Sequence, residues 1–182
     1  MQVACASGAG FLIPVNILKD IGLFKERFFM YHEDVDLSWR ARIAGYEIIL
    51  IPEAIVYHKY SFTKGKKKFY FVEKNRLDFV FSNFQARTIL LILIPFLLNE
   101  LLITLYSIVD GWFLYKIASS FTFLFNLGRI ASSRRKLKRI VPDKQLINFI
   151  SGEVSFSAKK LPLQNFYNRV YCTYWNFVKK LI

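Results

Sequence analysis

Residues 31–40 read YHEDVDLSWR, and three of the first six side chains in this stretch are carboxylates. The stretch opens a predicted helix from about Glu33 to Ala44. The helix ends at Gly45, because glycine accepts the left-handed backbone conformation that follows many helices. Short apolar runs of the kind that form strands flank this helix, at residues 2–6, 11–13, 46–51 and 55–58. A shorter helix is predicted before it at Val15–Ile21, because Pro14 suits a first helical turn and Gly22 stops the helix. Strands that alternate with helices predict one edge of an α/β sheet.

Charge divides the chain into two regions. The 182 residues are enough for one domain with an appendage, and 54% hydrophobic residues exclude an intrinsically disordered chain. Residues 1–58 carry 5 basic and 7 acidic side chains, whereas residues 59–182 carry 21 basic and 6 acidic ones. This asymmetry predicts two parts with different partners, which we place at residues 1–85 and 86–182.

The cysteines and the first residues indicate the compartment. Cys5 and Cys172 lie far apart and have neither metal-site nor disulfide spacing. A reducing, cytoplasmic environment is therefore favoured. Residues 1–18 have no basic start before an apolar core, so no secretory signal is visible.

Two apolar segments of the second region predict contact with a membrane. Residues 88–109 are the most apolar part of the chain, but Pro95 and Glu100 interrupt them. A spanning helix needs about twenty apolar residues, so both a full span and a helix pair lying in the membrane surface fit this segment and residues 117–128. The basic cluster Arg134–Arg139 would then face anionic headgroups at the cytoplasmic face. Buried helices of a soluble bundle are the alternative.

The carboxylate cluster is the part of the sequence that indicates chemistry. Free N–H groups at a helix start favour ionised acids, whereas neighbouring acids raise one another's pKa. An acid balanced between these effects can act as a general base towards a hydroxyl. The alternative, which spacing alone favours, is that Glu33, Asp34 and Asp36 only cap the helix. Spacing alone also gives the single His58 no metal role.

The order of the short motifs is more specific than any one of them. A small-residue turn at Ser7–Gly10 is followed by GLFKERFFMY at residues 22–31 and by the acidic cluster. Gly-Tyr, Pro-Glu-Ala and a terminal histidine then follow in turn. In this order, residues 3–83 resemble the C-terminal half of the catalytic domain of family 2 glycosyltransferases. The rhamnosyltransferase-like enzymes of cell-surface polysaccharide assembly are the most similar; Lys25 departs from the family pattern, which usually has Asp there.

The resemblance implies a fold and a reaction. The fold would be a partial GT-A sheet, the nucleotide-diphospho-sugar transferase fold, followed by a mostly α-helical, membrane-associated tail. The reaction would transfer a sugar, with inversion, from a nucleotide-diphosphate sugar to a lipid-linked or polysaccharide acceptor. Asp34 would be the general base, and Glu33 would shape the acceptor pocket or tune Asp34.

The resemblance also implies binding residues and partners. Gly8, Ala9 and Gly10 would lie against the sugars, because residues without a bulky side chain allow close approach of the backbone. His58 would contribute to a Mg²⁺ or Mn²⁺ site at the donor diphosphate. Arg40 matches a family position but is expected to form a structural ion pair.

The family's donor-binding half is not recognisable in this sequence. Only 32 residues precede Glu33, and one βαβ unit already needs about thirty. We therefore expect a truncated enzyme that binds donor poorly alone and works with a separate N-terminal half. A non-catalytic, membrane-binding remnant is the alternative. A nucleic-acid partner is not expected, because the basic charge adjoins apolar runs and no binding motif is visible.

Overall fold

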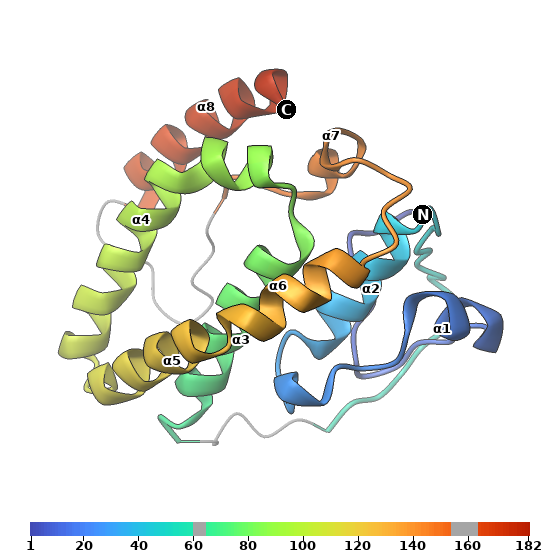
Figure 1. Cartoon of the computed structure of the whole chain (residues 1–182), viewed down its shortest axis with the longest axis horizontal. Coiled ribbons are helices and arrows are strands. Elements are labelled where there is room, and N and C mark those ends of the chain that lie inside the picture. The colour runs from blue at the N-terminus through green and yellow to red at the C-terminus, as the bar shows by residue number, and fades with distance from the viewer. Residues whose placement is uncertain (60–64, 154–163) are drawn as a thin grey trace.

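The structure, a computed structural model, describes residues 1–59, 65–153 and 164–182. Within these ranges the protein is mostly helical. A helical arm, residues 86–125, packs beside a smaller unit that holds the N-terminus (Figure 1). In chain order the elements are α1 (Val15–Ile21), η1 (Glu26–Phe28), α2 (Glu33–Ile43), α3 (Lys68–Asn83), α4 (Ala86–Val109), α5 (Phe113–Phe125), α6 (Leu127–Lys136), α7 (Asp143–Leu146), η2 (Ile147–Phe149) and α8 (Gln164–Leu181).

The two helices predicted for the first region are confirmed. Helix α1 begins after Pro14, whose fixed φ suits a helix start, and ends at Gly22 with φ 81°. Helix α2 begins at the carboxylate cluster, and Gly45 follows it with φ 92°. Both glycines therefore adopt the left-handed region in which a side chain would be strained.

The predicted GT-A sheet is wrong. Among the residues that the structure describes there is no strand, and the sole ladder contact is one antiparallel bridge between Gln2 and Ile49. The bridge is accompanied by a hydrogen bond from the Val3 N–H to the Ile48 carbonyl, 3.0 Å long. An apolar run joins a sheet only where a neighbouring strand pairs with its backbone. The runs at residues 11–13 and 55–58 have no such neighbour in the described part.

Side chains of α2 form hydrogen bonds with the backbone of the N-terminal segment, in the place that a neighbouring strand would take in a sheet. Arg42 donates to the Ala4 carbonyl (2.9 Å), and Ser38 Oγ accepts the Ala6 N–H (3.0 Å). Asp34 Oδ2 accepts the Gly8 N–H (2.8 Å). Four helical residues rise about 6 Å and two extended residues about 6.6 Å, so the two spacings match. The extended segment is thereby held by a helix face, and its pairing with another extended segment is limited to the bridge at Gln2.

The apolar core of this unit lies where α2 meets α3 and α7. Its buried members are Trp39, Ile43, Phe84 and Leu146. The rings of Trp39 and Phe84 lie 5.5 Å apart between centroids, a contact typical of packed aromatic pairs. Phe79 of α3 lies edge-on to both rings. This cluster fixes α2, and with it the carboxylates at its start, against α3.

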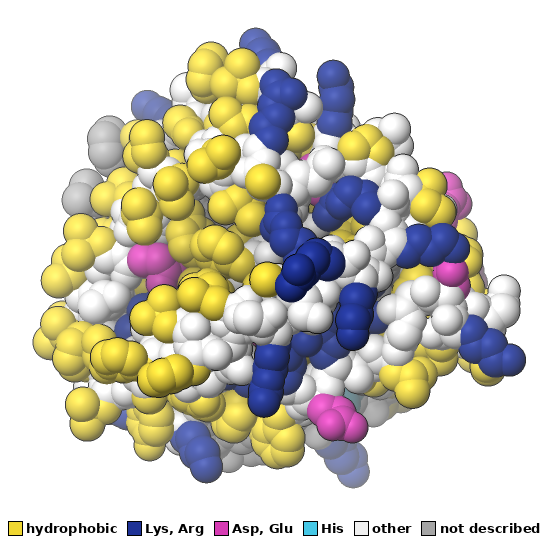
Figure 2. All heavy atoms as spheres, viewed as in Figure 1, with side chains coloured by type: hydrophobic (Ala, Val, Ile, Leu, Met, Phe, Trp, Pro, Cys, Tyr) yellow, Lys and Arg dark blue, Asp and Glu magenta, His cyan; other side chains and the backbone are white. Residues whose placement is uncertain are grey.

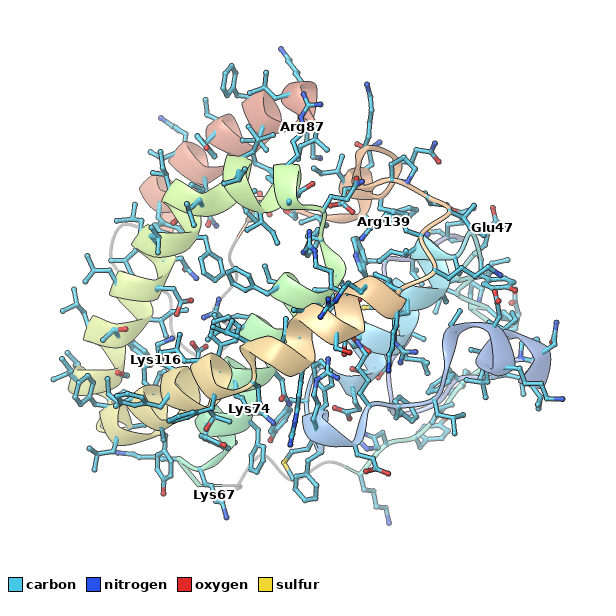
Figure 3. The ribbon with its side chains drawn as sticks, in the orientation of Figure 1. Glu47, Lys67, Lys74, Arg87, Lys116 and Arg139 are labelled. Atoms are coloured by element: carbon cyan, nitrogen blue, oxygen red, sulfur yellow. The ribbon has the colours of Figure 1, made fainter. Side chains whose placement is uncertain are left out.

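Buried charges fasten the helical arm to α3. Lys116 of α5 is buried, and its Nζ lies 2.6 Å from Glu73 of α3 and 2.7 Å from Glu100 of α4 (Figure 3). Arg76 of α3 pairs with the same two carboxylates. Two acids and two bases from three helices therefore satisfy one another. Glu100, the acid that interrupts the apolar segment, is turned inward by these pairs.

Helix α4 runs through Pro95 without a break, although proline offers no N–H to the carbonyl four residues earlier. That carbonyl belongs to Leu91, and the Tyr174 hydroxyl of α8 donates to it at 2.5 Å. The Tyr171 hydroxyl donates to the Pro95 carbonyl at 2.7 Å. Helix α8 thus replaces the hydrogen bond that the proline removes.

The opposite face of α4 is apolar and exposed. Only Thr88 and Ser107 of its 24 residues are buried. Figure 2 shows hydrophobic side chains gathered over α4 and α5, with Lys and Arg side chains beside them across the middle of the same face. By length and composition, α4 is the one helix in the described ranges that could cross a membrane. Its exposed side chains include Leu90, Ile94, Leu97, Leu98, Leu101 and Leu105.

Candidate functional site

Asp34 lies in the first turn of α2 and is half-buried. Its two carboxylate oxygens accept different backbone donors: Oδ2 accepts the Gly8 N–H and Oδ1 the Val35 N–H, each at 2.8 Å. A Cβ at Gly8 would lie 3.3 Å from Asp34 Oδ2, tighter than an ordinary contact. The small residue is therefore needed for this approach. The structure brings together two of the predicted site residues, Asp34 and Gly8.

The predicted site residues Ala9, Gly10 and His58 are all exposed. Ala9 is exposed, and its N–H donates to Ser7 Oγ at 3.3 Å. A Cβ at Gly10 would lie 3.0 Å from Val56, so the turn packs against the segment that ends at His58. His58 itself is exposed. The turn thus lies between Asp34 on one side and residues 55–58 on the other.

Glu33 precedes Asp34 at the first position of α2. Its Oε2 atom is buried and has no hydrogen-bond partner among the described residues. Buried polar atoms are almost always paired, so an unpaired carboxylate oxygen beside the predicted base is a feature expected of a functional site.

The loop before α2 is held in an unusual backbone conformation. Phe29, Tyr31 and His32 all have positive φ, between 58° and 66°, which costs non-glycine residues about 1–3 kcal/mol each. The Asn75 side chain of α3 compensates. Its amide nitrogen lies 2.7–2.8 Å from the carbonyls of Phe28, Met30 and Tyr31. Asn75 therefore positions the loop that leads to Glu33 and Asp34. It was not predicted from the sequence, because it lies more than forty residues from the loop it binds.

Asp36, the third acid of the cluster, is structural. It is fully buried, and its carboxylate accepts Lys25 at 2.7 Å, Arg40 at 2.8 Å and Asn83 at 2.9 Å. Burial alone would raise the pKa of Asp36, but the charges of Lys25 and Arg40 outweigh it and lower the pKa. The expected structural ion pair of Arg40 is confirmed. Lys25, the departure from the family pattern, is the second cation of this acid.

Two neighbours of Asp34 are uncharged near neutral pH. Burial, helped by the charge of Arg76, lowers the pKa of His32 at the N-cap of α2. Burial and the charge of Asp34 raise the pKa of the Cys5 thiol. Asp34 therefore has a neutral imidazole and a neutral thiol beside it.

The described residues do not form a complete metal site. In the described ranges, no three His, Cys, Asp or Glu side chains come close enough together to hold a metal ion. One exposed imidazole, that of His58, supplies a single ligand, whereas catalytic metal sites use three or more protein or substrate ligands. The local residues therefore do not fit a resident Mg²⁺ or Mn²⁺ on their own.

Comparison with known proteins finds similarity in the first region. The family described as "Glycosyltransferase like family 2" matches residues 1–78. Residues 1–78 are similar to family 2 glycosyltransferases. Two curated relatives match a shorter stretch. Each is an N-acetylglucosaminyl-diphospho-decaprenol L-rhamnosyltransferase of Mycobacterium tuberculosis, from strain CDC 1551 / Oshkosh and strain ATCC 25618 / H37Rv, and each is 38% identical over 64 residues.

The stretch shared with the two relatives covers only part of this chain and part of each relative. The matched stretch is 35% of this chain and 21% of each relative, so the chain spans about a fifth of the length of the curated relatives it matches. Among solved structures, none matches the chain significantly. Residues 1–78, which the family matches, include Asp34, the Gly8 turn and Asn75, whereas α4, α5 and α6 lie outside this range.

Proposed function

We propose that this chain is the acceptor-side part of an inverting glycosyltransferase, with Asp34 as its general base. The observation that carries the proposal is the Asp34–Gly8 contact at 2.8 Å within the glycosyltransferase-like residues 1–78. That contact orients a half-buried carboxylate at the start of a helix, next to a turn of small residues. Glu33, with its unpaired buried oxygen, adjoins the base and supports a role in tuning it.

The geometry suits proton transfer from a sugar hydroxyl. Each oxygen of an ionised carboxylate can accept two hydrogen bonds, and each oxygen of Asp34 accepts one from the backbone. One lone pair per oxygen remains for the acceptor hydroxyl. As the hydroxyl oxygen bonds to the anomeric carbon of the donor, its proton moves to Asp34 and the bond to the nucleoside diphosphate breaks. We assign no step to a metal ion, because the described residues do not complete a site for one.

The substrates follow from the similarity. Both relatives are named for transfer of L-rhamnose to N-acetylglucosaminyl-diphospho-decaprenol. We propose an acceptor of the same class, a sugar linked through diphosphate to a long isoprenoid, and a nucleotide-diphosphate sugar as donor. The donor would be held with the help of a separate polypeptide segment.

The apolar face supports a location at the cytoplasmic face of a membrane. Helices α4 and α5 expose many apolar side chains, while Glu100 of α4 and Lys116 of α5 face α3. Exposed apolar patches of this kind mark membrane or protein contacts. A peripheral or partly inserted arm would place the Asp34 unit next to lipid-linked acceptors.

Replacement of Asp34 by Asn tests the proposed base. Sugar transfer is measured in membranes that contain the chain and a protein carrying the donor-binding half, with labelled nucleotide sugars and polyprenyl-diphosphate-linked acceptor. General-base catalysis is worth about 10²–10⁴-fold, so Asp34→Asn should lower kcat at least about a hundredfold. Glu53→Gln removes an exposed carboxylate and should leave kcat unchanged. Retained turnover in Asp34→Asn would refute the role of Asp34.

The apolar face also favours a second candidate function, a non-catalytic membrane-binding module. This function needs α4, α5 and their exposed surface but not Asp34. Vesicle flotation of the full chain, combined with the absence of sugar transfer in every pairing with a donor-binding protein, would favour the second candidate.

A further inference from the structure

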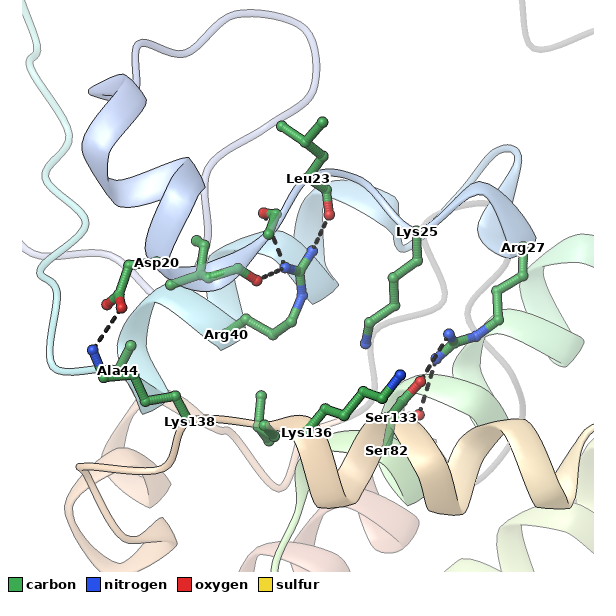
Figure 4. A pocket seen from close by; sticks show the side chains of 13 residues that line it. Asp20, Leu23, Lys25, Arg27, Arg40, Ala44, Ser82, Ser133, Lys136 and Lys138 are labelled. Atoms are coloured by element: carbon green, nitrogen blue, oxygen red, sulfur yellow. Dashed lines mark hydrogen bonds and ion pairs between the residues drawn. The ribbon is translucent and has the colours of Figure 1, made fainter.

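A cavity of about 250 Å³ lies between the glycosyltransferase-like part and the end of α6 (Figure 4). The segment after α1 and the second half of α2 form one wall. Ser82 of α3 with Ser133 and Lys136 of α6 form the other. Asp34 does not line this cavity, so the cavity is separate from the proposed catalytic residue.

The walls of the cavity are strongly cationic. Five lining residues are basic and one, Asp20, is acidic. Figure 4 shows the lysine and arginine side chains entering from both walls. A cavity that gathers this many cations has a positive potential, which attracts anionic groups. The basic lining residues are Lys25, Arg27, Arg40, Lys136 and Lys138.

Protein acids neutralise only part of this charge. Arg27 forms a two-bonded pair with Asp78, at 2.7 and 2.8 Å, and Lys138 pairs with Asp20. Lys25 and Arg40 share the single carboxylate of Asp36.

Lys136 has no acidic partner in the part of the chain that the structure describes. Three acids therefore face five bases, and two positive charges remain. Burial lowers the pKa of Lys25, and the nearby charges of Arg27 and Arg40 lower it further, as expected where cations crowd together.

The remaining donors suit a phosphate. Ser133 Oγ accepts Arg27 Nη1 at 3.0 Å, and its own proton is not donated to any described residue. The Lys136 ammonium likewise has all its protons available. Arg27 and Arg40 already donate to several protein oxygens. The serine hydroxyl and the lysine ammonium are therefore the main donors left for phosphate oxygens.

The geometry points to this cavity as a binding site for a phosphomonoester or diphosphate group. Two charges on such a group would offset the two that the acids leave. The ligand chemistry is shared by a lipid headgroup and a soluble phosphate ester. Both a lipid and a soluble ester are considered, because the α6 residues that line the cavity come directly after the apolar arm in the chain.

Binding of inorganic pyrophosphate by the full chain in detergent tests the soluble source. Vesicles of phosphatidylcholine containing phosphatidic acid, compared with vesicles containing phosphatidylglycerol at matched charge, test the lipid source. Lys136→Gln removes the unpaired cation without breaking any described contact, so this variant should fold. Lys144→Gln, an exposed lysine outside the cavity, is the matched control.

We expect Lys136→Gln to weaken at least one of the two interactions about tenfold, the effect of one charge-assisted hydrogen bond, and Lys144→Gln to weaken neither. Loss of pyrophosphate binding alone would identify a soluble ester, and loss of the preference for phosphatidic acid alone a lipid headgroup. Equal losses in both variants, or no binding of either probe by the wild type, would overturn the proposal. An Asp34→Asn variant should bind both probes normally, which separates this test from that of the proposed enzyme.

Discussion

Helices α2 and α4 reverse the usual relation between polarity and burial. Helix α2 has the charged sequence EDVDLSWRARI, yet residues 36–43 are all buried. Helix α4 is strongly apolar, yet only Thr88 and Ser107 are buried. Globular proteins normally bury the apolar helix and expose the charged one.

The difference shows what each helix is built to contact. The charged side chains among residues 36–43 of α2 all have partners: Asp36 has two cations and an amide, and Arg40 and Arg42 donate to backbone carbonyls. Apart from Glu33, the buried charges of α2 are therefore satisfied within this chain. Helix α4 leaves its apolar face exposed in the described ranges, as is typical of surfaces that contact a membrane or another protein.

The largest effect on the α2 side is expected from Asp36→Ala. The change leaves Lys25 and Arg40 as buried charges without their acid, which typically costs 3–5 kcal/mol, so we expect a loss of about 4 kcal/mol of unfolding free energy. Denaturant unfolding in detergent, followed by circular dichroism, measures this loss. Glu53→Gln is the control and should change stability by less than about 0.5 kcal/mol. A similar stability in both variants would contradict the account of α2.

On the α4 side, Ile94→Lys should weaken membrane binding. A lysine at the centre of an inserted apolar helix costs about 2.5–3.5 kcal/mol, which corresponds to about a hundredfold in vesicle partition. Ile51→Lys places the same charge at an exposed apolar position outside the arm and should leave partition unchanged. Both variants should unfold like the wild type, because neither side chain is buried. Equal partition of the two variants would show that α4 does not contact lipid.

Low pH should weaken the ion pairs of Asp36 on α2 and of Glu73 on α3. The pKa of Asp36 and that of Glu73 are lowered in the folded protein, because their partner cations outweigh the effect of burial. Lowered carboxyl pKa values contribute stability above the unfolded value of about 4, and this stability is lost as the pH falls through the folded values. The melting temperature should therefore drop as the pH falls below about 5. The drop should be smaller in Asp36→Ala, and an identical drop would contradict the assignment to Asp36.

The smallest effect on stability is expected from Asp34→Asn. This carboxylate only accepts two backbone hydrogen bonds, and the Asn oxygen can still accept one, so we expect a loss of about 1 kcal/mol. The same unfolding measurement places this value beside that of Asp36→Ala. A loss as large as that of Asp36→Ala would make Asp34 structural and weaken its case as the base.

Local signals in the sequence predicted the helices but not the sheet. Proline before α1 and glycine after α1 and α2 act on the backbone within a few residues, so their effect is visible in the sequence. The strand-like runs were misread because apolar β-branched residues favour a strand only when a partner strand is present. Here the side chains of α2 take the backbone groups of the first run.

The site was predictable to the extent that it is local. Glu33 and Asp34 stand at a helix start that the sequence marks, and the small residue at Gly8 is needed where Asp34 approaches. Which acid is structural was not predictable, because the cations of Asp36 come from separate elements. Asn75 and the basic cavity were missed for the same reason, since both depend on residues far apart in the chain.

The Tyr174 hydroxyl that bonds the Leu91 carbonyl has a consequence for how the arm could enter lipid. Hydrocarbon offers no donor to a carbonyl freed by proline, and each such group left bare there costs several kcal/mol. Helix α4 would therefore carry α8 along whenever it penetrates a leaflet, so that the Leu91 carbonyl never meets the acyl chains alone. On insertion the two helices would act as a single unit, in which α8 makes the proline of α4 tolerable.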